Sequence, residues 1–233
     1  MVRIEGSGIS TQLNPFGPNW NTPKVDKAAT VAQQVQAKLF GHTKPALLDP
    51  ANFPELAAMI AQLYRYKRKL AVIGGDEDED YIIVLADGTI GMIDEFGVIY
   101  LGAKLLHDFG DKLDVIVGVL AHEIGHRPKR WQDYISDQEL SQEQIEELCR
   151  HEETRADIFA GKALAELGLS CEPLIEFLQN IEDKPHPEYF EAKVRGEVIR
   201  EAFSNRSCRV ENRRKTFPEF DRMTSPKGHL GEV

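Results

Sequence analysis

The most informative segment of the chain is Val119-Leu120-Ala121-His122-Glu123-Ile124-Gly125-His126. Together with residues 112–118, its apolar positions recur at helical spacing, which predicts a helix buried on at least one broad face. On that helix His122 and His126 lie one turn apart, so both imidazoles can reach one ion. Glu123 is offset by about 100°, so it borders the ion rather than ligating it. The pattern indicates a hydrolytic metalloenzyme in which Glu123 is general base and then acid on a zinc-bound water.

Two helix boundaries can be read from local signals. Pro128 follows the quoted segment directly and predicts that the first helix ends just before it, because residues that precede proline disfavour the α region. Ser141 with Gln144 three residues later resembles a capping box, and Gly168 is a C-terminal stop signal. We therefore expect one long helix, or two abutting helices, over residues 141–167.

The second helix supplies the missing ligand. A catalytic zinc ion usually has three protein ligands, and the histidines provide only two. Glu153 and Asp157 lie four residues apart and so share one helix face. We expect Glu153 to be the third ligand and Asp157 to accept the free N–H of a ligating His, which fixes its tautomer. Glu152 is the alternative ligand, with a less favourable spacing to Asp157.

These residues resemble the gluzincin zinc metallopeptidases, in particular soluble relatives of the HtpX and CAAX prenyl protease type. Residues 119–126 look like the motif helix of that family, and residues 153–161 look like its Glu-x-x-Ala-Asp segment. The run 93–101 is similar to the strand pair that precedes the motif helix. His186-Pro187 followed by Arg195 is a weaker echo. The resemblance implies a zincin-like fold that binds Zn²⁺ and hydrolyses peptide bonds, with His186 in an oxyanion-stabilising or gating role.

The resemblance extends over about residues 80–200 and leaves two other functions open. The membrane members of the family have transmembrane helices, whereas this chain has no apolar run of about 18 residues. The spacing from His126 to Glu153 is short for the larger members and is similar to that of ImmA/IrrE-type regulatory peptidases, which cleave repressors. The other alternative is a non-catalytic zinc-binding scaffold that binds a partner peptide without cutting it.

The expected fold is α+β, mostly helical, with a small mixed or antiparallel sheet next to the motif helix. Residues 81–85, 89–93 and 98–101 read as strands, and Asp87-Gly88 reads as a hairpin turn between the first two. An extended peptide substrate could add itself to one edge of this sheet.

The remaining helices and the domain limits follow from periodicity and composition. Helices are expected over residues 24–39 and 54–70, packed behind the sheet. Residues 1–23 read as an extended arm, either disordered or a pro-segment across the cleft, and 24–205 as one metallopeptidase domain. Residues 206–233 read as a basic tail, either solvated or a docking surface.

Composition restricts the partners and the compartment. The formal net charge of −10 and the pI of about 5.2 disfavour nucleic acid or an anionic membrane, so the expected partner is a protein or peptide substrate. The 3 cysteines form no Cys-x-x-Cys pair and are expected to be reduced. Since no secretory signal is visible, we expect a cytoplasmic protein, or one exported by a dedicated secretion machine.

Several further residues are candidates for the neighbourhood of the metal. Besides His186, the groups that could stabilise an oxyanion are His151, Arg155, Tyr189 and Arg195. Trp131 and Tyr134 could line the cleft, although core packing is the more frequent role of such residues, and Cys149 shares the helix face of Glu153. The alternation of Asp76, Asp78 and Asp80 is similar to a calcium loop, but Tyr81 stands where that loop needs glycine, so an exposed acidic turn is expected.

Overall fold

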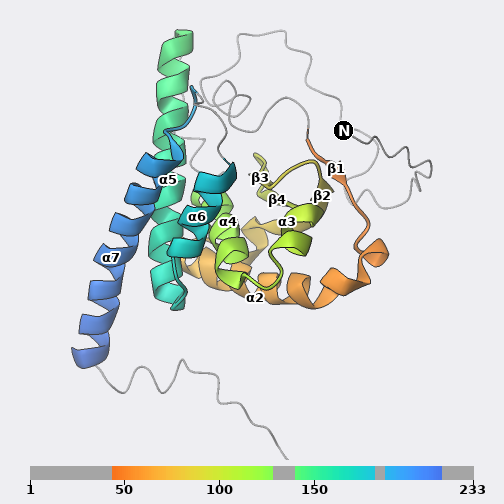
Figure 1. The fold of residues 1–233 in the computed structure, drawn as a ribbon, viewed down its shortest axis with the longest axis horizontal. Coiled ribbons are helices and arrows are strands. Elements are labelled where there is room, and N and C mark those ends of the chain that lie inside the picture. Colours follow the sequence, from red (N-terminus) through yellow and green to blue (C-terminus); the bar gives the residue numbers. More distant parts are fainter. Residues whose placement is uncertain (1–43, 128–139, 182–186, 217–233) are drawn as a thin grey trace, which may run out of the picture.

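The computed structural model describes residues 44–127, 140–181 and 187–216, with side chains described up to residue 209. The fold is α+β and mostly helical, with a small four-stranded sheet (Figure 1). Its elements, in chain order, are β1 (Ala46–Leu47), η1 (Pro50–Asn52), η2 (Pro54–Leu56), α2 (Ala57–Gly74), η3 (Asp78–Asp80), β2 (Ile82–Asp87), β3 (Gly91–Ile93), β4 (Val98–Gly102), α3 (Ala103–Asp108), α4 (Leu113–Gly125), α5 (Gln142–Leu167), α6 (Glu172–Ile181) and α7 (Ala192–Thr216).

The sheet is mixed, and its strand order is β1-β2-β4-β3. Strand β4 pairs in parallel with β2 and antiparallel with β3. The predicted hairpin at Asp87-Gly88 is therefore wrong, because β4 lies between the two strands that it was expected to join. All five residues of β4 are buried, and such a strand is stable only with a neighbour on each side. The hairpin of this sheet is β3–β4, closed by a turn in which the Gly97 N–H donates to the Asp94 carbonyl at 3.0 Å.

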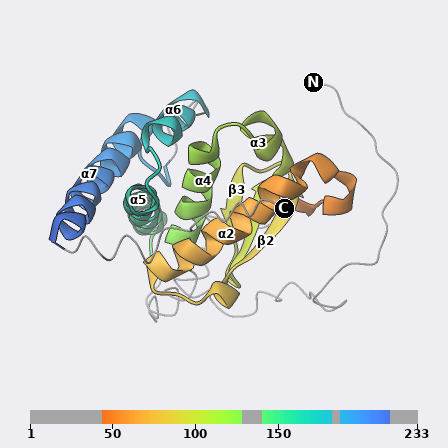
Figure 2. The same ribbon diagram turned by 90° about the horizontal axis from the view of Figure 1, so that it is seen from below.

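Helix α4 lies between the sheet and a layer formed by α5, α6 and α7 (Figure 2). It is buried without interruption from Val115 to Ala121, as predicted for a helix with a broad apolar face. One hydrophobic core connects it to its neighbours. Fully buried side chains of that core include Leu63 and Leu70 of α2, Ile99 and Leu101 of β4, Ile116 and Leu120 of α4, and Leu164 of α5.

The predicted helix boundaries at the motif are confirmed. Helix α4 ends at Gly125 with His126 as its C-cap, just before Pro128. Helix α5 is a single helix that begins after Ser141, whose side chain forms the predicted capping box with Gln144. It ends at Gly168, which has a φ of 71°. The helix expected over residues 54–70 is present as η2 followed by α2.

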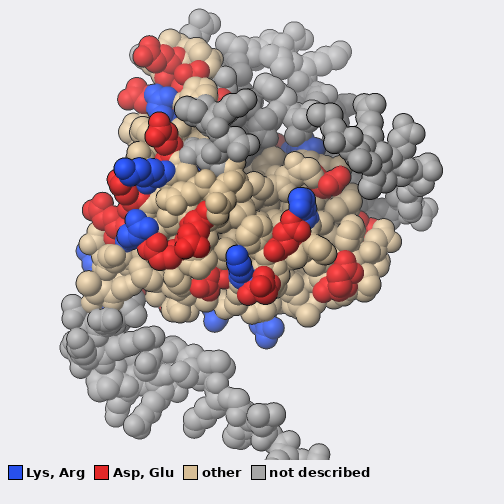
Figure 3. Space-filling model, viewed as in Figure 1, with Lys and Arg blue, Asp and Glu red and all other residues tan. Residues whose placement is uncertain are grey.

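The predictions for the N-terminal residues and for the C-terminal domain boundary have different outcomes. The arm 1–23 and the helix expected over 24–39 lie outside the described residues. Helix α7 continues to Thr216, so the domain boundary expected at residue 205 falls inside a helix. Over the face shown in Figure 3, acidic and basic side chains are interspersed, and acidic groups gather along the end of α5 that begins at Gln142. Among the described helices none combines the length and apolar character that a membrane span requires.

Candidate metal centre

Two helices bring the candidate ligands together by crossing at very short range. The crossing point on α4 is Gly125, where an added Cβ would lie 2.8 Å from Ala156 Cα and 3.0 Å from the Ala156 carbonyl oxygen of α5. A side chain larger than hydrogen at this position would push the helices apart. Glu153 and Asp157 flank Ala156 along α5, so the close approach places both carboxylates over the histidines of α4.

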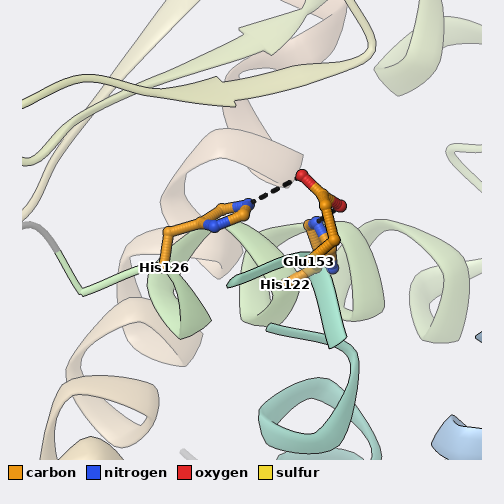
Figure 4. Close-up of side chains that lie close together, drawn as sticks. All are labelled: His122, His126 and Glu153. Carbon is orange, nitrogen blue, oxygen red and sulfur yellow. Dashed lines mark ion pairs between the residues drawn. The ribbon is translucent and has the colours of Figure 1, made fainter. Parts of the chain in front are cut away.

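The three predicted ligands converge on one point (Figure 4). Glu153 Oε2 lies 3.3 Å from His122 Nε2, and Glu153 Oε1 lies 3.6 Å from His126 Nε2. The candidate ligand atoms of the three side chains all lie within 4.8 Å of one another. This spacing suits side chains that share one small cation. All three side chains are largely shielded from solvent, with 15%, 3% and 13% of their surfaces exposed for His122, His126 and Glu153.

Asp157 fixes the orientation of the first histidine, as predicted. Its Oδ1 lies 2.9 Å from His122 Nδ1, so the imidazole donates its Nδ1–H there and its Nε2 atom faces Glu153. Arg195 of α7 in turn holds Asp157 through two hydrogen bonds, from Nε to Oδ2 at 2.8 Å and from Nη2 to Oδ1 at 3.0 Å. At the distance between His122 Nε2 and Glu153, either a proton on Nε2 or a metal ion can lie between the ring and the carboxylate.

The pKa values reflect the same electrostatics. Burial lowers the pKa of His122, but the hydrogen bonds and charges of Asp157 and Glu153 outweigh it and raise that pKa to about 10. Burial raises the pKa of Glu153, but the hydrogen bond from His122 and the neighbouring cations bring it to about 2. For His126, burial dominates and lowers the pKa to about 4. The cluster thus holds Glu153 as a carboxylate and favours positive charge beside it.

Glu123 borders the ligands without joining them. It is only 7% exposed, and it packs so closely on β3 that a Cβ at Gly91 would lie 2.7 Å from Glu123 Oε1. Burial is the largest of the effects that raise its pKa to about 7. A carboxyl group with such a pKa can both take and return a proton near neutral pH.

A cavity of about 270 Å³ opens onto the ligands. Its histidine, acidic and basic residues are the metal cluster, which consists of His122, His126 and Glu153, together with Glu123, Asp157 and Arg195. The remaining walls are mainly apolar. They come from β3 and the residue before it, from α4, from α6 and from the segment before α7: Ile90, Gly91, Met92, Val119, Leu174, Phe177, Leu178, Ile181 and Tyr189. The contribution of α6 was missed from the sequence, although its apolar residues recur every three to four positions, the pattern of an amphipathic helix.

The other sequence candidates are divided between the cavity and the rest of the molecule. Tyr189 and Arg195 line the cavity, and the Arg195 guanidinium lies 5.5 Å from the Tyr189 ring centre. His151 is exposed. Arg155 donates to Glu152 at 2.7 Å, so the alternative ligand Glu152 belongs to a separate ion pair.

Four further candidates have different outcomes. Cys149 is fully buried and is not one of the clustered ligands. His186, Trp131 and Tyr134 lie outside the described residues, so their predicted roles remain predictions.

The three aspartates that alternate like a calcium loop were expected in an exposed turn, but the Asp76 side chain is only 6% exposed, against 39% for Asp78. Asp76 accepts from Arg127 at 2.7 Å, and Asp80 accepts from the backbone N–H of Glu77 at 2.9 Å. Asp78 lies 3.1 Å from the buried Lys67 ammonium group. Each carboxylate therefore has its own partner.

No protein-family model, curated protein or solved structure matched this chain in the comparisons. The functional argument therefore rests on the geometry and chemistry of the cluster.

Proposed function

We propose that this chain is a zinc-dependent metalloendopeptidase of gluzincin type with a zincin-like fold, in which His122, His126 and Glu153 bind Zn²⁺. The observation that carries the proposal is the convergence of two imidazole Nε2 atoms and one carboxylate beside the buried Glu123. Two imidazoles and a carboxylate with an open position are the donor set that zinc has in many hydrolases. When bound there, zinc would supply Lewis-acid activation of a peptide carbonyl and of a water molecule.

The residues of the chain have separate roles in this reaction. Glu123 would take a proton from the attacking water at its carboxylate and return it to the leaving amine, which its pKa of about 7 favours. Asp157 holds His122 in the tautomer that exposes Nε2. Arg195 forms an ion pair with Asp157 and so neutralises its charge. Because Arg195 Nη2 also lies 3.5 Å from Glu153 Oε2, Arg195 orients the third ligand as well.

The substrate proposal rests on the sheet and on the walls of the cavity. Strand β3 is an edge of the described sheet, and Gly91 and Met92 of β3 line the cavity. An extended peptide could therefore pair with β3 while its scissile bond lies over the metal cluster. Because α6 provides apolar walls, an apolar side chain next to the scissile bond is favoured over a charged one.

The two alternatives predict other outcomes with the same protein. A regulatory peptidase of the ImmA/IrrE type would use the same chemistry on a folded repressor, so it differs only in substrate. A non-catalytic scaffold would bind zinc and a peptide without hydrolysis. The presence of a buried general base at the cluster favours the enzyme over the scaffold.

The test compares wild type with Glu123→Gln, using Glu152→Gln as the matched control. Glu152 is also buried, but it pairs with Arg155 and does not line the cavity. Zinc per chain is measured by elemental mass spectrometry, and hydrolysis is measured on a quenched peptide library. We expect about one zinc in all three proteins and a loss of hydrolysis of about 10²–10⁴-fold in Glu123→Gln alone.

Two outcomes would overturn the proposal in different ways. Full hydrolysis by Glu123→Gln would exclude the mechanism. Stoichiometric zinc without hydrolysis of peptides or folded proteins by any of the three proteins would favour the scaffold. If His122→Ala retained as much zinc as wild type, the assignment of the ligands would be wrong.

A further inference from the structure

The residue that follows the second histidine has an unusual backbone conformation. Arg127 has a φ of 47°, and among the described residues it is the only one other than glycine with a positive φ. Side chains other than Gly, Asn and Asp rarely adopt this region, because Cβ approaches the backbone too closely. Such a conformation persists only where neighbouring contacts hold it.

The contacts that hold Arg127 come from the segment that follows the C-terminal end of α2. Arg127 Nη2 donates to Asp76 Oδ1 at 2.7 Å, and the Tyr81 hydroxyl donates to Asp76 Oδ2 at 2.7 Å. The side chain of Asp76 is 6% exposed and Tyr81 is 2% exposed. Burial is the largest effect that raises the pKa of Tyr81, so its hydroxyl stays protonated and remains a donor.

Asp76 is itself fixed by its surroundings. Its backbone N–H donates to the Ala71 carbonyl at 2.9 Å, just beyond the C-terminal end of α2 at Gly75. The loop that follows is anchored by the buried Lys67, which donates to the Tyr81 carbonyl at 2.7 Å. Asp76 therefore presents a rigid acceptor to Arg127.

Arg127 directly follows His126, the candidate ligand at the C-terminal end of α4. His122 lies within α4, whereas His126 is the C-cap, held by N–H donation to the Glu123 carbonyl at 3.2 Å. The last turn of a helix is the part that opens most readily. His126 is thus the ligand on α4 that most needs an external anchor.

We propose that Asp76 and Arg127 are positioning residues that fix the last turn of α4 and so hold His126 in place to bind the metal. This inference rests on the proposed zinc site. The ion pair holds Arg127 in its left-handed conformation, and that conformation ends the helix with the His126 ring directed at Glu153. Neither residue lines the metal cavity, so their effect passes through the backbone of His126.

The chain contains a matched ion pair for comparison. Asp94 accepts from Lys44 at 2.6 Å and from the Tyr100 hydroxyl at 3.2 Å, as Asp76 accepts from Arg127 and Tyr81. The exposed fractions of the cation and carboxylate are 35% and 2% in that pair, against 31% and 6% in the pair of Arg127 and Asp76. Asp94 does not line the metal cavity.

The first experiment measures two quantities on the full chain for wild type, Asp76→Asn and Asp94→Asn. The zinc dissociation constant is measured by competition with a chromophoric chelator, and Tm is measured after metal removal. We expect Asp76→Asn to weaken zinc binding about 10- to 100-fold, the range of partners that orient ligands. Asp94→Asn should lower Tm and leave zinc affinity within about twofold of wild type. Equal zinc affinity in wild type and Asp76→Asn would overturn the inference.

A second pair of variants separates backbone positioning from charge. Both Arg127→Ala and Arg127→Gly remove the guanidinium, but only glycine adopts a positive φ without strain. We expect Arg127→Gly to bind zinc several-fold more tightly than Arg127→Ala. If Arg127→Ala and Arg127→Gly bound zinc equally well, or if both bound it more tightly than wild type, Arg127 would not act through its backbone conformation. Either result would contradict the proposal.

The two proposals fail in different ways. If wild type binds no zinc, the proposed function fails. If wild type binds zinc and all four variants bind it equally well, the zinc site stands and the positioning role is wrong.

Discussion

The metal cluster and the Asp94 cluster, which consists of Asp94 with its partners Lys44, Phe96, Val98 and Tyr100, both bury a carboxylate. They differ in the groups that surround the carboxylate oxygens. Asp94 accepts from two backbone N–H groups, those of Phe96 and Val98, and from the side chains of Lys44 and Tyr100. Its oxygens are thus surrounded by donors. In the metal cluster, the oxygens of Glu153 face the Nε2 atoms of His122 and His126, which can each bind either a proton or a metal ion.

The clusters also differ in how the chain builds them. Most partners of Asp94 lie within the β3–β4 hairpin, a few residues away in the sequence. In the metal cluster, Glu153 of α5 lies 31 positions from His122 and 27 from His126 in the sequence, and the geometry depends on the helix crossing at Gly125. Burial of a charged side chain therefore does not by itself mark a functional site. The informative feature is that side chains able to bind a metal ion, here two imidazoles and a carboxylate, converge on one point.

The largest effect is expected when the metal cluster loses its carboxylate. Glu153→Ala should weaken zinc binding more than about 100-fold, because loss of an outer partner alone costs 10- to 100-fold. Glu152→Ala is the control, since it removes the neighbouring carboxylate, which pairs with Arg155. Both are measured by chelator competition. Equal loss in the two variants would mean that general damage to α5, and not a missing ligand, is responsible.

A smaller effect is expected when the helix crossing is disturbed. In Gly125→Ala the new methyl group would meet the backbone of Ala156, so we expect a destabilisation of about 1–3 kcal/mol and weaker zinc binding. In Gly118→Ala the nearest atoms belong to the side chain of Leu174, which can move, so both effects should be smaller. Denaturant unfolding of the metal-free proteins and zinc titration check the two parts. Unchanged zinc affinity in Gly125→Ala would show that the cluster tolerates a wider crossing.

The smallest effect concerns a buried thiol outside both the metal cluster and the surroundings of Asp94. Burial and the Glu172 carboxylate raise the pKa of the Cys171 thiol to about 11. Below that pKa the reactive thiolate gains about tenfold per pH unit, so alkylation of Cys171 should be slow at pH 8 and accelerate tenfold by pH 9. Mass spectrometry of iodoacetamide-treated native protein measures this, with the exposed Cys208 as the fast internal reference. Comparable rates for the two thiols at pH 8 would contradict it.

The local parts of the site could be predicted from the sequence. His122 and His126 share a face by helical spacing, and Glu153 and Asp157 do so for the same reason. The capping pattern at Ser141 placed the second pair on a helix, which the structure confirms. Each of these predictions depended only on residues that lie within one or two helical turns of each other.

The parts that were missed depend on contacts between distant residues. The order of strands β2 and β4 could not be read from Asp87-Gly88, because a turn signal does not say which strand comes next to which. Asp76 and Arg127 are 51 positions apart, and neither belongs to a recognisable motif. Arg195 was one of several candidates for stabilising an oxyanion, and that role stays a prediction. Its hydrogen bond to Asp157 could not be read from the sequence, because the two residues are 38 positions apart.

The origin of the ligands on two different helices has a consequence for the life of the protein in a cell. An ion held by His122, His126 and Glu153 would act as a crosslink between α4 and α5 and would stabilise the folded chain by mass action. At a free zinc concentration 100 times the dissociation constant, that stabilisation is about 2.7 kcal/mol. The folded fraction, and with it resistance to cellular proteases, would then rise and fall with zinc supply, so metal starvation would reduce the amount of this protein as well as its activity.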